Sequence, residues 1–102
     1  MIIYNVTTNI DDSVHDDWLN WMKTVHIPDV MATGLPIGNR MLRLLTEIEN
    51  GGQTYSVQYF FADMEDYLAY QDDYSMKLRK EVDRRYQGKY VAFRTLLEEV
   101  KQ

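Results

Sequence analysis

Cysteine is absent from the 102 residues of this chain. That absence excludes a disulfide scaffold, a thiolate nucleophile and any metal site built from cysteines. It is also typical of proteins in a reducing compartment, so the cytoplasm is the expected location.

Long hydrophobic runs are missing as well. No stretch approaches the roughly 20 apolar residues that a membrane-spanning helix needs. The opening residues, MIIYNVTTNIDD, contain no basic residue, and their apolar run is too short for a signal peptide. We therefore expect no membrane contact and a single domain over residues 1–102, a length that leaves no room for a second domain.

Positive charge is the scarcer sign, with 11 Lys and Arg against 16 Asp and Glu and a net charge of −5. Nucleic acid repels such a chain unless basic residues gather on one face. The basic segment KLRKEVDRRYQGK, residues 77–89, is the one candidate for such a face. It also occupies the second half of a predicted helix, where the helix dipole favours cations. We prefer the dipole explanation, and no nucleic-acid partner is expected.

Recognisable catalytic and cofactor motifs are missing too. The chain has no glycine-rich phosphate loop, no G-x-S-x-G turn and no H-E-x-x-H helix. Its two histidines, His15 and His26, would lie about 16 Å apart along a helix at 1.5 Å per residue, too far to share one metal ion. Neither a metal nor a cofactor is expected.

Hydrophobic spacing predicts six main elements. Period-two segments predict strands at residues 2–10, 39–49, 53–62 and 89–100, although the LLEEV end of the last could also be helical.

Helical spacing begins at Val14, with Asp12 or Ser13 as the expected cap. Pro28 is expected to end that helix, starting a short second piece that Gly34 closes. A later helix is predicted between a cap at Asp63 and a stop at Gly88, and the NGG at residues 50–52 predicts a hairpin.

The resulting order, β-α-β-β-α-β, predicts an α+β fold of the ferredoxin-like kind. Right-handed crossovers and one central hairpin favour a four-stranded antiparallel sheet with both helices on one face.

Both faces of this sheet are expected to be largely apolar. One set of alternate positions holds Ile2, Tyr4, Val6, Leu42, Leu44, Tyr55, Val57, Tyr59, Phe61, Val91, Phe93 and Leu97. The opposite set is mixed and holds Ile3, Asn5, Thr7, Met41, Arg43, Leu45, Ser56, Gln58, Phe60, Tyr90, Arg94 and Leu96. Two helices cover one set only, and an uncovered apolar patch usually marks an interface. We expect a homodimer in which the two sheets pack against each other. The alternative is a monomer with an exposed apolar surface.

The segments MIIYNVT, WLNWMKTVHIPDV and VAFRT resemble a small bacterial family known only as a domain of unknown function. The whole chain is similar to the dimeric α/β-barrel superfamily, which includes cofactor-free antibiotic-biosynthesis monooxygenases, muconolactone isomerase, sugar mutarotases and haem-degrading enzymes. This resemblance implies the dimeric barrel but assigns no reaction. The predicted second helix contains no histidine, unlike that of haem-binding members, so haem is not expected, although ligation by tyrosine stays open.

His26 is the candidate catalytic residue, because by position it matches the first-helix histidine that the resemblance to mutarotases implies as acid or base. A position near a helix C-terminus would favour its imidazolium form. The alternative is that it hydrogen-bonds a free carbonyl at the helix end.

Polar strand residues and aromatic side chains supply the candidate ligand contacts. The residues are Asn5, Trp18, Arg43, Gln58, Tyr59 and Arg94. For the arginines, an acidic ligand and structural partners such as Glu47 or Glu49 are alternatives. For the aromatic stripe, which also includes Tyr4, Tyr67, Tyr70 and Tyr74, plain core packing is the alternative.

Two functions follow from these residues. The first is a small dimeric module that binds a ligand or a partner without catalysing a reaction. The second is a cofactor-free monooxygenase or isomerase acting on a small anionic or polyketide-like carbonyl compound, with His26 as acid or base.

Overall fold

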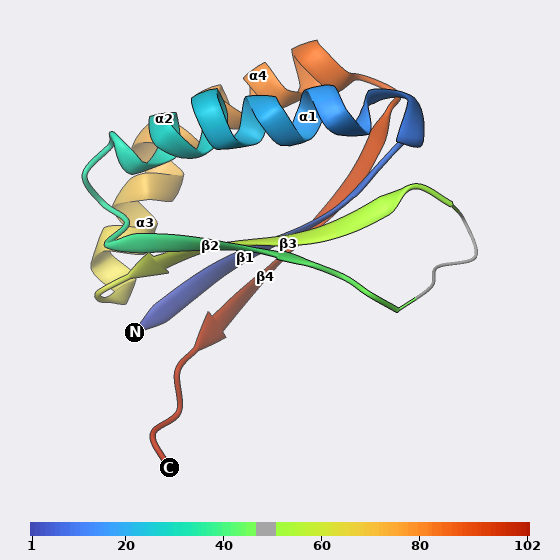
Figure 1. Ribbon diagram of the computed structural model, residues 1–102. Helices are drawn as coiled ribbons and strands as arrows, with labels where there is room; N and C mark the ends of the chain where they lie inside the picture. The colour runs from blue at the N-terminus through green and yellow to red at the C-terminus, as the bar shows by residue number, and fades with distance from the viewer. Residues whose placement is uncertain (47–50) are drawn as a thin grey trace.

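The computed structural model describes residues 1–46 and 51–102 and has the predicted β-α-β-β-α-β order. Strands β1 (Ile2–Ile10), β2 (Gly38–Arg43), β3 (Gln53–Phe61) and β4 (Tyr90–Glu98) form one antiparallel sheet in the order β2-β3-β1-β4. All the helices lie on one side of this sheet, and the other side is open (Figure 1). The ferredoxin-like prediction is confirmed.

The first helical region is continuous, and the prediction that Pro28 ends it is wrong. A short turn, η1 (Asp12–Val14), leads into α1 (His15–Trp21), the π-helical segment η2 (Met22–His26) and α2 (Ile27–Met31). Ile27 keeps helical angles of φ −61° and ψ −45°, and its N–H donates to the carbonyl of Met22, five residues earlier. This wider turn already displaces the hydrogen-bond ladder that Pro28 would interrupt, so the proline is tolerated.

The second helical region repeats this construction. It consists of α3 (Met64–Tyr70), the π-helical segment η3 (Gln71–Ser75) and α4 (Met76–Tyr86). The predicted cap at Asp63 is present, because its carboxylate accepts from the N–H of Asp66 at 2.9 Å. In the first region the cap is Asp11 rather than Asp12 or Ser13, since Asp11 accepts from both the backbone and the hydroxyl of Ser13.

The predicted faces are correct for β1 and β3 and wrong for β2 and β4. Strand pairing sets Leu42 opposite Ser56, Phe93 opposite Thr7 and Leu97 opposite Ile3, which places these residues on the open face. By the same pairing, Met41, Arg43, Tyr90, Arg94 and Leu96 share the helix-covered face with Tyr4. Both edge strands carry apolar residues at successive positions, so their alternation specifies the register weakly.

Two further boundaries differ from prediction. Strand β2 ends at Arg43, although the N–H of Leu44 still donates to the carbonyl of Thr54. The rest of the predicted 39–49 strand reaches into residues 47–50, which lie outside the described residues, as does Asn50 of the hairpin signal. Strand β4 remains extended through Glu98, so its end is a strand rather than a helix.

The core fills the space between the helices and the covered face of the sheet. Trp18, Phe61 and Ile10 are its largest fully buried side chains, and Tyr4, Tyr59 and Tyr70 are nearly as deeply buried. Tyrosine-rich packing of this kind brings hydroxyl groups into the interior, and these groups need polar partners.

Gly52 and Gly51 provide a matched pair for testing the turn before β3. Both have positive φ, +70° and +72°, but a Cβ on Gly52 would lie 2.7 Å from the carbonyl oxygen of Ile10, whereas one on Gly51 would meet nothing within 4 Å. We expect Gly52→Ala to lower the free energy of unfolding by roughly 1–3 kcal/mol more than Gly51→Ala. Urea unfolding of both variants measures the difference, and equal losses would contradict the described approach of Gly52 to β1.

Candidate functional site

A cavity of about 50 Å³ lies between the helices and the covered face of the sheet. The first helical region supplies Trp18, Met22 and His26. The covered face of strands β1, β3 and β4 forms the floor of the cavity, and residues of the second helical region line it as well. The polar and aromatic groups that line it include Tyr4, Trp18, His26, Tyr59, Tyr70 and Arg94.

The candidate site residues divide between the two faces of the sheet. His26, Trp18, Tyr59 and Arg94 line the cavity together. Asn5 and Gln58 pair with each other across β1 and β3 on the open face, so they cannot contact a molecule inside the cavity of the same protomer. There Asn5 bonds Ser56 and Thr7, and Gln58 accepts from Arg40 at 2.8 Å.

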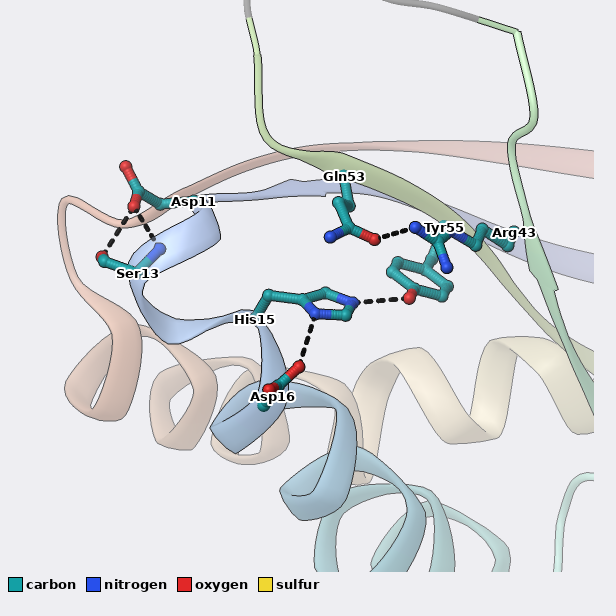
Figure 2. Close-up of polar contacts among 7 residues, drawn as sticks. All are labelled: Asp11, Ser13, His15, Asp16, Arg43, Gln53 and Tyr55. Atoms are coloured by element: carbon teal, nitrogen blue, oxygen red, sulfur yellow. Dashed lines mark hydrogen bonds and ion pairs between the residues drawn. The ribbon is translucent and has the colours of Figure 1, made fainter.

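Arg43 lies apart from both groups, at the end of β2. Its guanidinium donates to the side chain of Gln53 and sits 6.0 Å from the centre of the Tyr55 ring (Figure 2). These two contacts are local and structural. The predicted common site for all four polar strand residues is therefore not formed within one protomer.

His26 has a different environment from the one its sequence context suggested. It ends the π-helical segment η2 in the middle of the helical region, so there is no helix C-terminus to stabilise its imidazolium form. Its ring stacks on Trp21, with centroids 5.2 Å apart and planes at 25°. Burial lowers its pKa to about 4, and the nearby charge of Asp29 offsets only part of that effect. His26 is therefore neutral at neutral pH.

The Nδ1 atom of His26 is buried and has no hydrogen-bond partner within residues 1–46 and 51–102. The alternative in which His26 bonds a free main-chain carbonyl through this atom is thus not observed. A buried polar atom left unpaired costs about 1–3 kcal/mol, so such atoms are rare and call for an explanation. π-Helical segments themselves are frequent at functional sites.

The low pKa of His26 makes stability depend on pH. The unfolded chain takes up this proton near pH 6.5, whereas the folded chain does so only near pH 4. The free energy of unfolding should therefore fall by about 3 kcal/mol as the pH drops from 6.5 to 4. We expect His26→Phe to lose this part of the pH dependence in urea unfolding, and NMR titration of the wild-type ring near pH 6.5 would contradict it.

Three tyrosines, Tyr4 of β1, Tyr59 of β3 and Tyr70 of α3, line the same cavity. Tyr4 packs against Tyr59 and Tyr70, with centroids 6.4 Å and 6.2 Å apart, and its hydroxyl accepts from Nε of Arg94 at 3.1 Å. Burial raises the pKa of both Tyr59 and Tyr70. These hydroxyls therefore stay protonated and can donate hydrogen bonds inside the cavity. Tyr74, which belongs to the predicted aromatic stripe, is 41% exposed and does not line the cavity.

An outer groove of about 260 Å³ adjoins the cavity between α4 and β4. Arg79, Tyr90, Ala92 and Arg94 line both spaces, so they form the mouth of the cavity. The Tyr90 hydroxyl donates to Asp83, and burial together with that carboxylate raises the pKa of Tyr90 to about 12. Arg79 is not among the residues predicted from the sequence, because the helix dipole was sufficient to explain the whole basic 77–89 segment.

The other histidine, His15, belongs to a separate cluster at the start of α1. Its Nε2 lies 2.6 Å from the Tyr55 hydroxyl and its Nδ1 lies 2.9 Å from a carboxylate oxygen of Asp16 (Figure 2). The His15 ring also stacks on Tyr55 at 5.6 Å. These contacts join the start of the helix to β3.

Metal-binding and membrane-spanning features are absent from the described residues. They contain no group of three His, Asp or Glu side chains placed to hold a metal ion. None of the helices in this part of the chain is long and apolar enough to cross a membrane.

A family described as a domain of unknown function, DUF4286, matches residues 1–100. No curated protein matches the chain.

Several solved structures share the fold at low identity. HapK from Hahella chejuensis is 12% identical with a TM-score of 0.71, over 100% of this chain and 95% of that one. An EthD family protein from Bacillus halodurans is 12% identical with a TM-score of 0.69, over 98% and 100%. A dimeric ferredoxin-like protein of unknown function from Thermobifida fusca is 16% identical with a TM-score of 0.56, over 95% and 92%. At these identities the likeness shows the ferredoxin-like fold of dimeric α/β-barrel proteins and no activity.

Proposed function

Because the chain belongs to the DUF4286 family, whose description assigns no activity, we propose from the geometry alone that it is a homodimeric binding protein for a small organic molecule. The ligand occupies the cavity between helices and sheet in each protomer. Trp18, His26, Tyr59 and Arg94 contact it. Asn5 and Gln58, which lie on the open face of the sheet, do not contact it, and neither does Arg43, which shares the covered face but lies at the end of β2 outside the cavity.

The unpaired Nδ1 of His26 is the observation that carries this proposal. A buried nitrogen without a partner loses hydrogen bonding that it had in water. His26 lines the cavity together with Tyr4, Tyr59, Tyr70 and Arg94. A ligand that bonds Nδ1 once the ring turns toward the cavity removes this cost, which a purely structural histidine would leave in place.

The volume of the site fits a small molecule that reaches from the cavity into the groove. At about 50 Å³ the inner cavity is well below the roughly 150 Å³ that holds benzene in an engineered core. The adjoining groove adds about 260 Å³, which brings the combined space near the lower end of the roughly 300–1,000 Å³ of ligand pockets.

Dimerisation is supported by the open face of the sheet. Phe93 is 63% exposed, Val91 70%, and Leu42 and Leu97 about two-fifths, all on that face. Val91, Phe93 and Leu97 form an exposed apolar row along the edge strand β4, and exposed apolar surface of this kind marks an interaction site. A second copy supplies a matching apolar surface around a two-fold axis, and the Thermobifida fusca relative is described as dimeric.

Ala92 offers a direct test because its small side chain lines both spaces at the mouth. Small aromatic acids, amides and alcohols should shift the NMR signals of the His26 imidazole and the Trp18 indole in the wild type. We expect Ala92→Leu to narrow the mouth. The ligand concentration that gives half of the maximal shift should then rise at least about tenfold, the equivalent of about 1.4 kcal/mol of binding free energy.

Ala62→Leu is the matched control, since Ala62 is exposed just after β3 and outside both spaces. It should bind as the wild type does. If no compound shifts either signal, or if Ala92→Leu and Ala62→Leu behave alike, the binding proposal fails.

The enzyme hypothesis receives less support from the same geometry. A base whose conjugate acid has a pKa of about 4 removes protons poorly at neutral pH. Asn5 and Gln58, the residues expected to position substrate oxygens, lie on the opposite face of the sheet. Binding without a reaction is therefore the function we propose.

A further inference from the structure

The mouth of the cavity carries two arginines without a carboxylate partner. The ion pairs within the described ranges join His15 to Asp16 and Arg85 to Asp17, and neither involves Arg79 or Arg94. Among the residues that the structure describes, Asp83 is the one acidic residue lining the groove, and it already accepts a hydrogen bond from the hydroxyl of Tyr90. In a chain of net charge −5, this is a locally positive opening.

Arg94 is held in a defined position at this opening. Its Nε donates to the Tyr4 hydroxyl at 3.1 Å, which fixes the plane of the guanidinium and leaves its terminal nitrogens to donate elsewhere. Arg79 and Arg94 both line the inner cavity and the outer groove, so both side chains border the same mouth.

Beyond the two arginines, the cavity is lined mainly by aromatic and apolar side chains. Trp18, Tyr59 and Met22 provide the walls, and His26 provides a hydrogen-bonding atom. Arginine forms two parallel hydrogen bonds with a carboxylate, so a planar acid matches the mouth. An aromatic ring, too large for the inner cavity as a whole, matches Tyr90 and Ala92, which line both the groove and the mouth.

We infer that the ligand is a small aromatic carboxylate, with its carboxylate between Arg79 and Arg94 and its ring in the outer groove and mouth, where one edge of the ring reaches the inner cavity. This inference rests on the proposed binding function and specifies the class of ligand. The carboxylate supplies the acidic partner that the two arginines lack within the described part of the chain.

Benzoate and benzamide test this assignment, because they share a shape and differ in charge. We expect benzoate to bind at least about tenfold more tightly than benzamide by NMR titration, since charge-assisted hydrogen bonds contribute more than neutral ones. Arg79→Gln and Arg94→Gln should each weaken benzoate about tenfold while leaving benzamide within about threefold. Arg94→Lys keeps the positive charge but not the paired hydrogen-bond donors, so it should lose less affinity for benzoate than Arg94→Gln does.

Arg84→Gln is the matched control, because Arg84 is exposed on α4 and lines neither the cavity nor the groove. It should bind benzoate as the wild type does. If both compounds bind equally and shift the His26 signal, or if Arg94→Gln and Arg84→Gln behave alike, the carboxylate assignment is wrong while the binding function stands. If neither these two compounds nor any other shifts that signal, both proposals fall together.

Discussion

Replacing Phe93 with aspartate should convert the proposed dimer to a monomer. Phe93 lies on the open face of the sheet and is 63% exposed in one protomer. A two-fold interface would bury the new carboxylate from both copies at once, and an unpaired buried charge costs several kcal/mol. Light scattering after size-exclusion chromatography should give about twice 12.1 kDa for the wild type and 12.1 kDa for Phe93→Asp.

Met76→Asp is the control for this experiment. Met76 is 69% exposed, but it lies on α4, on the other side of the sheet from the proposed interface. This variant should keep the wild-type mass. A wild-type protein with the mass of one chain at micromolar concentration, or a Phe93→Asp variant that remains dimeric, would contradict association through this face.

Truncation of Phe61 should cause the largest loss of stability. Phe61 is 0% exposed, and its ring meets the edge of Tyr67 at 5.5 Å and packs on Tyr70 at 5.6 Å. Phe61→Ala removes these contacts and leaves a void, at a cost of about 3–5 kcal/mol. Since domains are stable by only about 5–15 kcal/mol, the melting temperature should fall by roughly 12 °C or more.

Leu45→Ala serves as the comparison in this case. Leu45 is 89% exposed, so its truncation should change the free energy of unfolding by less than about 0.5 kcal/mol. Both variants must be compared at one protein concentration, because association links stability to concentration. A loss below about 1 kcal/mol for Phe61→Ala would mean that the core relaxes around the missing ring.

Local pattern was sufficient to predict the elements of this chain and their order. Strands β1 and β3 alternate regularly, so the alternation of their side chains assigns their faces correctly. The Asp63 cap followed from residue chemistry, since a carboxylate three residues before a free N–H can accept from it. Each of these features depends on neighbours close in sequence.

Pro28 and His26 show where local rules gave the wrong answer. Proline normally ends a helix, and that rule placed His26 at a C-terminus with a stabilised charge. The π-helical segment η2 carries the helix past Pro28, and packing against Trp21 and the sheet then buries the imidazole instead. The sign of the pKa shift of His26 was therefore decided by tertiary burial.

The residues of the site likewise depended on long-range pairing. Arg79 and Arg94 are fifteen positions apart in the sequence and meet at one opening because β4 pairs beside β1 under α4. Asn5 and Arg94, both polar strand residues, were separated by a one-residue difference in the register of an edge strand.

Sequence alone was enough for the ferredoxin-like order, the exclusion of thiol chemistry and the two-sided character of the sheet. Composition and short-range periodicity carry that information, because they determine which segments form helices and strands. The tertiary structure alone decided which face of β2 and β4 meets the helices, that His26 is neutral, and that its ring lines a cavity with two arginines at the mouth. Those properties arise from contacts between distant residues, and the energies of burial and of strand register are set only when those residues come together.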